Sequence, residues 1–507
     1  MSYNRNRLRK WPDVGGLLLA LALLAVLVGC RQSLPELSPM KYAPPASGKM
    51  WKPTPDALPE ALPSEKLPGI PPELQSSAKQ LALVQLVDVA LRINPSTQQA
   101  WGQARVAAAD WAVARGEYYP TVSGDVAGYG GNTGGGDLSG VMGQVGLSLS
   151  YLLLDFGGRE ARVASARQAL IAANWNHNQA IQDVLRNVPQ AYYTYIGNKA
   201  LVRAAEINLK EAKTSLHATE QRRRAGVSTI ADVLQAKANM EEVLFTLVSA
   251  RGSVEIGRGR LATAVGWPAN MAFDVAGEPK PLPLDRIDRN IKNLIQLAQR
   301  DRPELTAARA AVSQKEAGLR LAEADLWPRL TATGSAGWSG IDAKSSDWGD
   351  LDGSGASYFG GLRLQIPLFE GFALRNRVQK ARADLEAARA ALKMNEESVI
   401  SDVWDAYYNF RTAGQQLETS ESLLESATQS YEVSLARYKA GAADIVELLN
   451  AQSLLAKSRA QQVRARTDLH TSFAELLHAI GAELPTDTFG GSPESAGGRR
   501  VTQNEKK

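Results

Sequence analysis

The chain has 507 residues, which suits two to four ordinary domains or one elongated unit built from a repeat. Its charged content of 22% and hydrophobic content of 44% exclude a disordered chain, and its mean hydropathy of -0.23 excludes a helical membrane protein with many spans. One cysteine excludes a disulfide framework, and beyond residue 29 the 53 basic and 52 acidic side chains balance, so no nucleic-acid partner is indicated.

Residues 1–29 are predicted to be a lipoprotein signal peptide. The uncharged segment 14–29 is short for a membrane span but suits the apolar core of a secretory signal. It ends at Leu27-Val28-Gly29-Cys30, the pattern of a bacterial lipobox, and the chain's single cysteine lies there. We expect a covalent lipid on Cys30 to anchor the mature N-terminus to a bilayer. The alternative is an ordinary signal or membrane anchor in which Cys30 is merely an apolar residue.

Residues 30–80 are predicted to be an extended arm. Eleven of the 24 prolines of the chain lie in this segment. Such a density of proline disfavours helix and favours polyproline-like segments. At the other end of the chain, residues 482–507 are predicted to form a flexible tail.

The segment between arm and tail consists of two copies of one unit, residues 81–280 and 281–481. Ile93-Asn94-Pro95 is echoed by Asp301-Arg302-Pro303 at an offset of 208 residues, and Ala225-Gly226 is echoed by Ala440-Gly441 at an offset of 215. The second copy has therefore gained seven residues. This period is far longer than that of a solenoid repeat and indicates a duplicated half-molecule.

Each half contains two segments with the period-two alternation of a β-strand. They cover residues 121–130, 144–154, 329–340 and 358–368, with glycine-rich loops at 131–143 and 342–357. Strands of about 10 residues with one apolar face are typical of membrane barrels, although a soluble hairpin is the alternative. We expect one set to contact lipid (Leu147, Leu149, Leu362, Leu364, Ile366) and the other to face the lumen (Ser148, Ser150, Arg363, Gln365).

The helices between these strands are unusually long. Helix is expected over residues 96–118 and 229–265, and over about 66 residues each in 157–224 and 372–439. A helix of this length spans ~100 Å. Pro189 is expected to bend or locally unwind the first of the long helices.

Four strands also limit the oligomeric state. In lipid every backbone N–H and C=O group must be paired, so an open four-stranded sheet cannot span a membrane. Two chains would close an eight-stranded barrel filled by side chains, whereas three would close a barrel of twelve strands. The wide helical wall favours three.

The two turns that follow the long helices have matching capping signals. Arg222 precedes Gly226 and Arg437 precedes Gly441, which places basic residues in a last turn and glycine just beyond it. Thr229 with Asp232, and Asp444 with Glu447, then have the spacing of a capping box.

The order of these features resembles the TolC outer-membrane efflux family, and within it the lipid-anchored branch of OprM-type ducts. The resemblance rests on the lipobox, the proline-rich arm, the duplicated plan and two strand exits, Leu154-Asp155-Phe156-Gly157-Gly158 and Pro367-Leu368-Phe369-Glu370-Gly371. It covers about residues 35 to 482. It implies a homotrimer in which a twelve-stranded barrel in the outer membrane of a Gram-negative bacterium continues as an α-helical barrel across the periplasm.

The resemblance also implies a function and partners. The expected function is the exit duct of a tripartite pump for small molecules such as drugs, with a periplasmic adaptor and an RND-type inner-membrane transporter. The duct of a type I protein-secretion system shares the architecture and stays open as an alternative, as does a lipid-anchored coiled-coil spacer. The substrate and the particular adaptor and transporter are not specified.

The turns after the long helices are the expected end for docking and closure. Residues there, most of them small enough for a partner helix to approach closely, are predicted to receive the adaptor: Gly226, Val227, Thr229, Gly441 and Ala442. The ion pairs Arg222–Asp232 and Arg437–Glu447, together with Asp444, are the candidate gate. No catalytic role is expected, because the four histidines show no metal-ligand or catalytic spacing. No metal or cofactor is expected beyond the lipid on Cys30.

Overall fold

The computed structural model describes residues 69–132, 138–276, 282, 290–345 and 351–482. The signal peptide, Cys30 and most of the arm lie outside these residues, and so does the expected tail beyond Ala482.

The last part of the arm differs from the expected extended chain. Pro72–Ser77 form a short 3-10 helix, η3. Proline is tolerated at the first position of a helix because its missing N–H would have no intrahelical partner there. Ile70 and Leu74 pack against the core of the first half, and Leu81 forms a bridge with Val275. The arm therefore ends as part of the folded unit.

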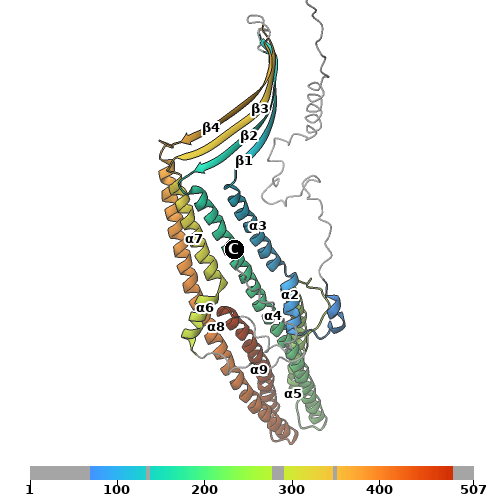
Figure 1. The fold of residues 1–507 in the computed structure, drawn as a ribbon. Coiled ribbons are helices and arrows are strands. Elements are labelled where there is room, and N and C mark those ends of the chain that lie inside the picture. Colours follow the sequence, from blue (N-terminus) through green and yellow to red (C-terminus); the bar gives the residue numbers. More distant parts are fainter. Residues whose placement is uncertain (1–68, 133–137, 277–281, 283–289, 346–350, 483–507) are drawn as a thin grey trace, which may run out of the picture. The chain divides into compact units, whose positions relative to one another are not determined.

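The predicted duplication of the helix and strand order is confirmed (Figure 1). The first half comprises α2 (Leu83–Ile93), α3 (Pro95–Gly116), β1 (Thr121–Asn132), β2 (Leu138–Leu154), α4 (Gly158–Arg224) and α5 (Ile230–Val265). The second comprises α6 (Ile291–Asp301), α7 (Pro303–Ala324), β3 (Arg329–Ser345), β4 (Leu351–Gln365), α8 (Ala373–Lys439) and α9 (Ile445–Ala479). Both α4 and α8 have 67 residues.

The motifs that repeat along the sequence mark helix boundaries. Asn94 accepts a hydrogen bond from the Ser96 backbone N–H at 2.9 Å, and Pro95 occupies the first helical position of α3. Arg302 and Pro303 occupy the equivalent positions ahead of α7. Gly266 ends α5 in the left-handed region at φ 99°, where glycine lacks the clash of a Cβ atom. The motifs that recur in the sequence are thus the residues at which helices begin and end.

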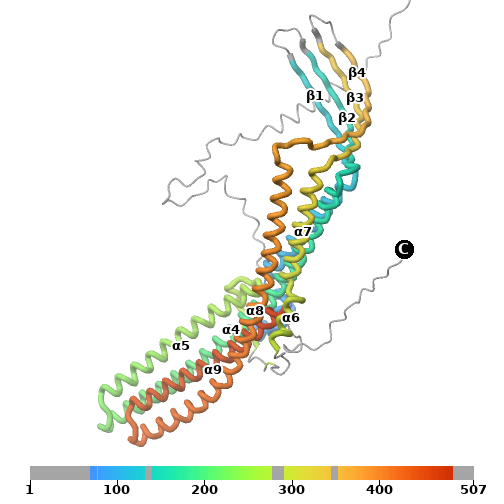
Figure 2. Tube along the Cα trace, turned by 90° about the vertical axis from the view of Figure 1, so that its left-hand side faces the viewer, coloured from blue at the N-terminus to red at the C-terminus, as the bar shows by residue number. Residues whose placement is uncertain are grey.

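The helices form two successive layers of four, joined by α4 and α8, which run through both. In the layer next to the sheet, α3 contacts α4, α4 contacts α7, and α7 contacts α8. In the second layer α5 contacts α4, α4 contacts α9, and α9 contacts α8, and the ribbon and tube views agree on this arrangement (Figures 1 and 2). Among the described residues, none of the helices combines the length and the apolarity needed to cross a bilayer.

Two equivalent cores lie where the layers meet. One joins α2, the middle of α4 and the end of α5, and includes the fully buried Val188. The other joins α6, the middle of α8 and the end of α9. The expected local unwinding at Pro189 is wrong, because α4 stays helical through this residue. Burial of Val188 and Pro189 in the core offsets the ~3 kcal/mol cost of an interior proline.

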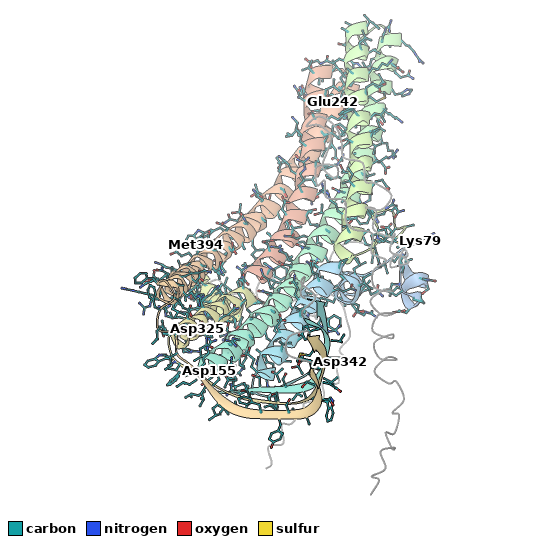
Figure 3. All side chains as sticks on the ribbon, turned by 90° about the horizontal axis from the view of Figure 1, so that it is seen from above. Lys79, Asp155, Glu242, Asp325, Asp342 and Met394 are labelled. Carbon is teal, nitrogen blue, oxygen red and sulfur yellow. The ribbon has the colours of Figure 1, made fainter. Side chains whose placement is uncertain are left out.

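The four strands form one antiparallel sheet in the order β1-β2-β3-β4. Within the described chain, β1 and β4 have no further strand beside them. The strands extend into the predicted glycine-rich loops. Glycine residues pair their backbone groups in the sheet, but they have no side chains whose alternation would indicate a strand in the sequence. At its other end β4 stops at Gln365 rather than 368, since Pro367 has no N–H for the ladder. Seen from above, the sheet follows a curve (Figure 3).

Candidate functional site

The register of the sheet separates an apolar face from a polar one. Residues paired across an antiparallel ladder point to the same side. Leu149 is paired with Val122, Leu147 with Ala336, Leu362 with Ala332 and Leu364 with Leu330. The predicted sharing of one face by these leucines therefore holds. Ile366 lies beyond the end of β4, so its place in this row is corrected.

The opposite face is lined mainly by small and polar side chains, although Phe359, paired with Ser335, also lies on it. Ser148 lies between Ser123 and Ser335, and the Ser123 and Ser148 hydroxyl oxygens are 2.7 Å apart. Ser150 pairs with Thr333, Arg363 with Thr331 and Gln365 with Arg329. These four predicted lumen residues share one face, as expected. Assignment of this face to a lumen and of the other to lipid stays a prediction.

The apolar face is exposed from the helix end of the sheet as far as Val145 and Trp338, beyond which Asp342 and Asp352 share it. Leu147 is 61% exposed and Leu362 is 69% exposed in the isolated chain. A continuous exposed apolar surface of this kind requires a partner that is not water. It fits the apolar band of a membrane barrel.

A tight turn connects each strand pair to its long helix. Phe156 and Gly157 take positive φ values of 52° and 90° ahead of α4, and Gly371 and Phe372 take 59° and 63° ahead of α8. The Asp155 carboxylate accepts a hydrogen bond from the Arg159 backbone N–H and so caps α4. Figure 3 shows Asp155 and Asp325 at the same end of the helices, beside the sheet.

Aromatic side chains collect at these turns. The rings of Phe156 and Trp327 stack at 5.4 Å, and those of Phe369 and Phe372 meet edge to face at 5.4 Å. All four side chains are at least half exposed. Aromatic girdles of this kind lie at the interfaces of membrane barrels. We predicted the strand exits as a motif but not this clustering, which requires Trp327 from the end of α7.

At the far end of the long helices, the predicted glycine caps are observed. Gly226 has φ 77° and Gly441 has φ 81°. The Val227 N–H donates to the Arg222 carbonyl at 3.0 Å, and the Ala442 N–H donates to the Arg437 carbonyl at 2.9 Å. These bonds satisfy carbonyl groups that a helix end leaves open. We refer to the two helix hairpin ends, residues 219–232 where α4 meets α5 and residues 437–447 where α8 meets α9, as the two tips.

The predicted ion pair between Arg222 and Asp232 is wrong. The Asp232 carboxylate instead accepts from the Thr229 N–H at 2.7 Å and from the Ser228 hydroxyl at 2.8 Å. These bonds, the backbone bond foremost, lower the pKa of Asp232. The physical reason is local: a capping box satisfies the carboxylate before a distant cation does.

The second predicted ion pair is present within its own tip. The Arg437 Nη1 atom lies 2.8 Å from the Glu447 Oε1 atom. Both side chains are more than a third exposed, so this pair contributes little to stability. Asp444 caps α9 by accepting from the Glu447 N–H at 2.8 Å. A gate role for Arg437, Asp444 or Glu447 stays a prediction.

Arg222 instead joins the two tips to each other. Its guanidinium donates to the Tyr438 carbonyl oxygen and lies 4.7 Å from the centre of the Tyr438 ring. The Tyr438 hydroxyl and the Thr219 hydroxyl form a buried hydrogen bond of 3.0 Å. We call Arg222, Tyr438 and Thr219 the tip bridge. We did not predict Tyr438 or Thr219, and the only sequence signal is a lone aromatic residue in a polar last turn.

The predicted docking residues lie on an open surface. A Cβ atom added at Gly226 would meet nothing within 4 Å, and one at Gly441 would meet only the Arg222 Nη1 atom at 3.7 Å. Val227 is 62% exposed, and Thr229 and Ala442 are exposed as well. Their use for docking stays a prediction. In the described part of the chain, no three His, Cys, Asp or Glu side chains are grouped as a metal site would require.

A sheet with one apolar face, continued by helices of ~100 Å, is the architecture of an outer-membrane channel subunit. Comparison with known proteins agrees. A family model described as "Outer membrane efflux protein" matches residues 86–267 and 294–482. The chain therefore belongs to the outer membrane efflux protein family.

Individual relatives extend over most of the chain. Protein CyaE of Bordetella pertussis is 31% identical over 438 residues, which are 86% of this chain and 90% of that protein. The solvent efflux pump outer membrane protein SrpC of Pseudomonas putida is 24% identical and covers 81% of this chain and 87% of its own length. The solved outer-membrane channel OprN has a TM-score of 0.70 at 21% identity and covers 84% of this chain and 98% of its own.

These findings confirm the predicted TolC-like fold, the outer-membrane location with extension into the periplasm, and the function as an efflux duct. The family consists of channel proteins rather than enzymes.

Proposed function

We propose that the chain acts as a homotrimer and forms the exit duct of a tripartite pump that exports small molecules. The observation that supports this most is the four-stranded sheet, whose edge strands β1 and β4 pair with no further described strand and whose apolar face is exposed. A sheet with open edges cannot span lipid, whereas three copies edge to edge close a barrel of twelve strands. The same symmetry joins the four-helix layers of the three chains into a helical barrel below it.

The names of three relatives support the proposed substrate class. SrpC is a solvent efflux pump protein, TtgI a toluene efflux pump protein and OpmQ a pyoverdine export protein. All three names describe export of small molecules, and they favour efflux over protein secretion for this chain. We infer a periplasmic adaptor that docks at Gly226, Val227, Thr229, Gly441 and Ala442, and an inner-membrane transporter of the RND type.

We also propose that the tip bridge belongs to the gate. An open duct would leak solutes, so the tips must be held together at rest. Arg222, Tyr438 and Thr219 connect the α4–α5 tip to the α8–α9 tip of the same chain. Asp232 and Asp444 hold helix ends, and Arg437 with Glu447 stiffens one tip. Adaptor contacts that favour separated tips would open the duct by a population shift.

Deletion of the gene tests the proposed efflux function. We expect the deletion strain to retain more of a small fluorescent export substrate, because the exit step is lost, and a plasmid copy of the gene to reverse this. The purified protein should form channels in planar bilayers. Unchanged accumulation together with loss of one secreted protein from the medium would favour the secretion alternative.

Lipidation of Cys30 is a separate proposal. The lipobox and the position of the chain's only cysteine support it. We expect Cys30→Ser to abolish labelling by a palmitate analogue, while the trimer still inserts because its strands have their own apolar face. The measurement is click-detection of the label on purified protein. Equal labelling of wild type and variant would refute the lipid assignment.

A further inference from the structure

A cavity of about 260 Å³ lies in the seam between α4 and α9, outside the strand faces and the tips. Its lining is apolar at the inner end and basic toward the outside. Tyr193, Ile196 and Gly197 are buried, whereas Arg203, Ile207 and Arg466 are exposed. The size is near the lower limit for ligand pockets, which suits a small ligand with about one ring.

The inner end of the cavity holds a histidine without a partner. His470 is only 5% exposed, and its ring stacks on Tyr193 with 4.5 Å between the ring centres. Its Nδ1 atom is enclosed and has no hydrogen-bond partner in the described part of the chain. Burial, assisted by Arg466, lowers the pKa of His470 to about 4, so the ring is neutral at pH 7. Because the Nδ1 atom is enclosed, a ligand in the cavity meets the neutral ring of His470 rather than this nitrogen.

The outer part of the cavity contains guanidinium groups that have no acidic partner among the described residues. The Arg459 guanidinium is not available to a ligand, because it bonds both Glu211 carboxylate oxygens at 2.7 and 2.8 Å. Arg203 and Arg466 form no ion pair with any described residue, and the cavity lining contains no acidic side chain. Two free guanidinium groups at the entrance of an apolar cavity favour an anionic ligand over a neutral or cationic one.

We propose that the α4–α9 cavity binds a small amphipathic carboxylate, with its apolar body against Tyr193 and Ile196 and its carboxylate near Arg203 and Arg466. The His470 ring, stacked on Tyr193, closes the inner end against the apolar body of the ligand. The proposal stands independently of the homotrimer and of the gate, because every residue involved belongs to two helices of one chain.

Two sources would supply this chemistry, an exported aromatic acid or a short fatty acid from the membrane. The test is calorimetric titration of the full-length protein, in a nonionic detergent, with 4-fluorobenzoate, its neutral analogue 4-fluorobenzamide, octanoate and inorganic phosphate. We expect 4-fluorobenzoate to bind at least about tenfold more tightly than the amide, because only the acid engages the guanidinium groups. Tighter binding of octanoate than of 4-fluorobenzoate supports the proposal and identifies the fatty acid as the source.

Matched variants separate this site from nonspecific charge. Arg203→Gln with Arg466→Gln should weaken 4-fluorobenzoate binding at least about tenfold. Arg464→Gln is the control, since Arg464 lies on the same helix, is also exposed and lines other cavities but not this one. Binding should also shift the ring resonance of His470, which His470→Phe identifies among four histidines. Equal binding of acid and amide, inorganic phosphate binding as tightly as the carboxylates, equal loss in the Arg464 variant, or no saturable binding at millimolar concentration would overturn the proposal.

Discussion

Leu147→Arg is expected to abolish assembly of the channel in the outer membrane, whereas Ser148→Arg should leave assembly intact. Leu147 lies in the middle of β2, on the apolar face, and Ser148 lies beside it on the polar face. An arginine on the lipid side near the bilayer midplane costs ~2–4 kcal/mol, and a trimer has three of them. Heat-modifiable trimers in outer-membrane extracts, detected by gel electrophoresis, measure the outcome.

Both substitutions place the same charged side chain at neighbouring positions of one strand, so each controls for the other. Ser148→Arg should also change single-channel conductance, since the new charge faces the pore. Leu364→Arg should show a smaller defect, because Leu364 is next to the end of β4 and thus near the membrane surface. Equal tolerance at positions 147 and 148 would refute the assignment of the apolar face to lipid.

Loss of the tip bridge is expected to raise the resting conductance of the duct. Arg222→Ala removes the bond to the Tyr438 carbonyl and the contact with its ring, and Tyr438→Phe removes the hydroxyl that bonds Thr219. A hydrogen bond to a charged group contributes about 1.5–3 kcal/mol, which corresponds to a change of about tenfold to a hundredfold in the ratio of open to closed tips. Planar-bilayer recordings without adaptor measure this ratio, and cells with the double variant should become sensitive to large antibiotics.

Arg223→Ala is the matched control for this experiment. Arg223 is adjacent and exposed, and its side chain bonds no other residue in the described chain. It should keep wild-type conductance. If the double variant inserts normally and stays as closed as the wild type, the gate lies elsewhere and the bridge only stabilises the helix pair.

The strand faces were predictable because alternation along a strand is a local property. Leu147 and Ser148 reveal their faces through their immediate neighbours, and the pairing register adds only which residues of other strands join them. The strand ends were less predictable, because the glycine-rich stretches next to them have no side chains to alternate. The apolar residues beside Pro367 favour a longer strand, but the missing N–H of this proline ends the strand before it.

At the tips, too, the sequence predicts contacts between near neighbours but not contacts between distant segments. The Arg437–Glu447 pair was predictable because its members face each other across one turn. Arg222 also had a nearby acid, Asp232, but that carboxylate was already satisfied by its own capping bonds. The true partner, Tyr438, is 216 residues away in sequence, and only the packing of one half of the molecule on the other brings it close.

The equal lengths of α4 and α8 determine where this molecule tolerates insertions. The seven residues that distinguish the halves lie between the start of the first strand and the start of the long helix, and both helices still have 67 residues. One residue added inside α4 would rotate everything after it by about 100° and turn the side chains that pack on α5 and α9 away from them. The glycine-rich strand ends have no such constraint. The strand ends at the outer mouth of the duct can therefore change in length, whereas the length of the long helices, and with it the distance that the duct extends into the periplasm, stays fixed.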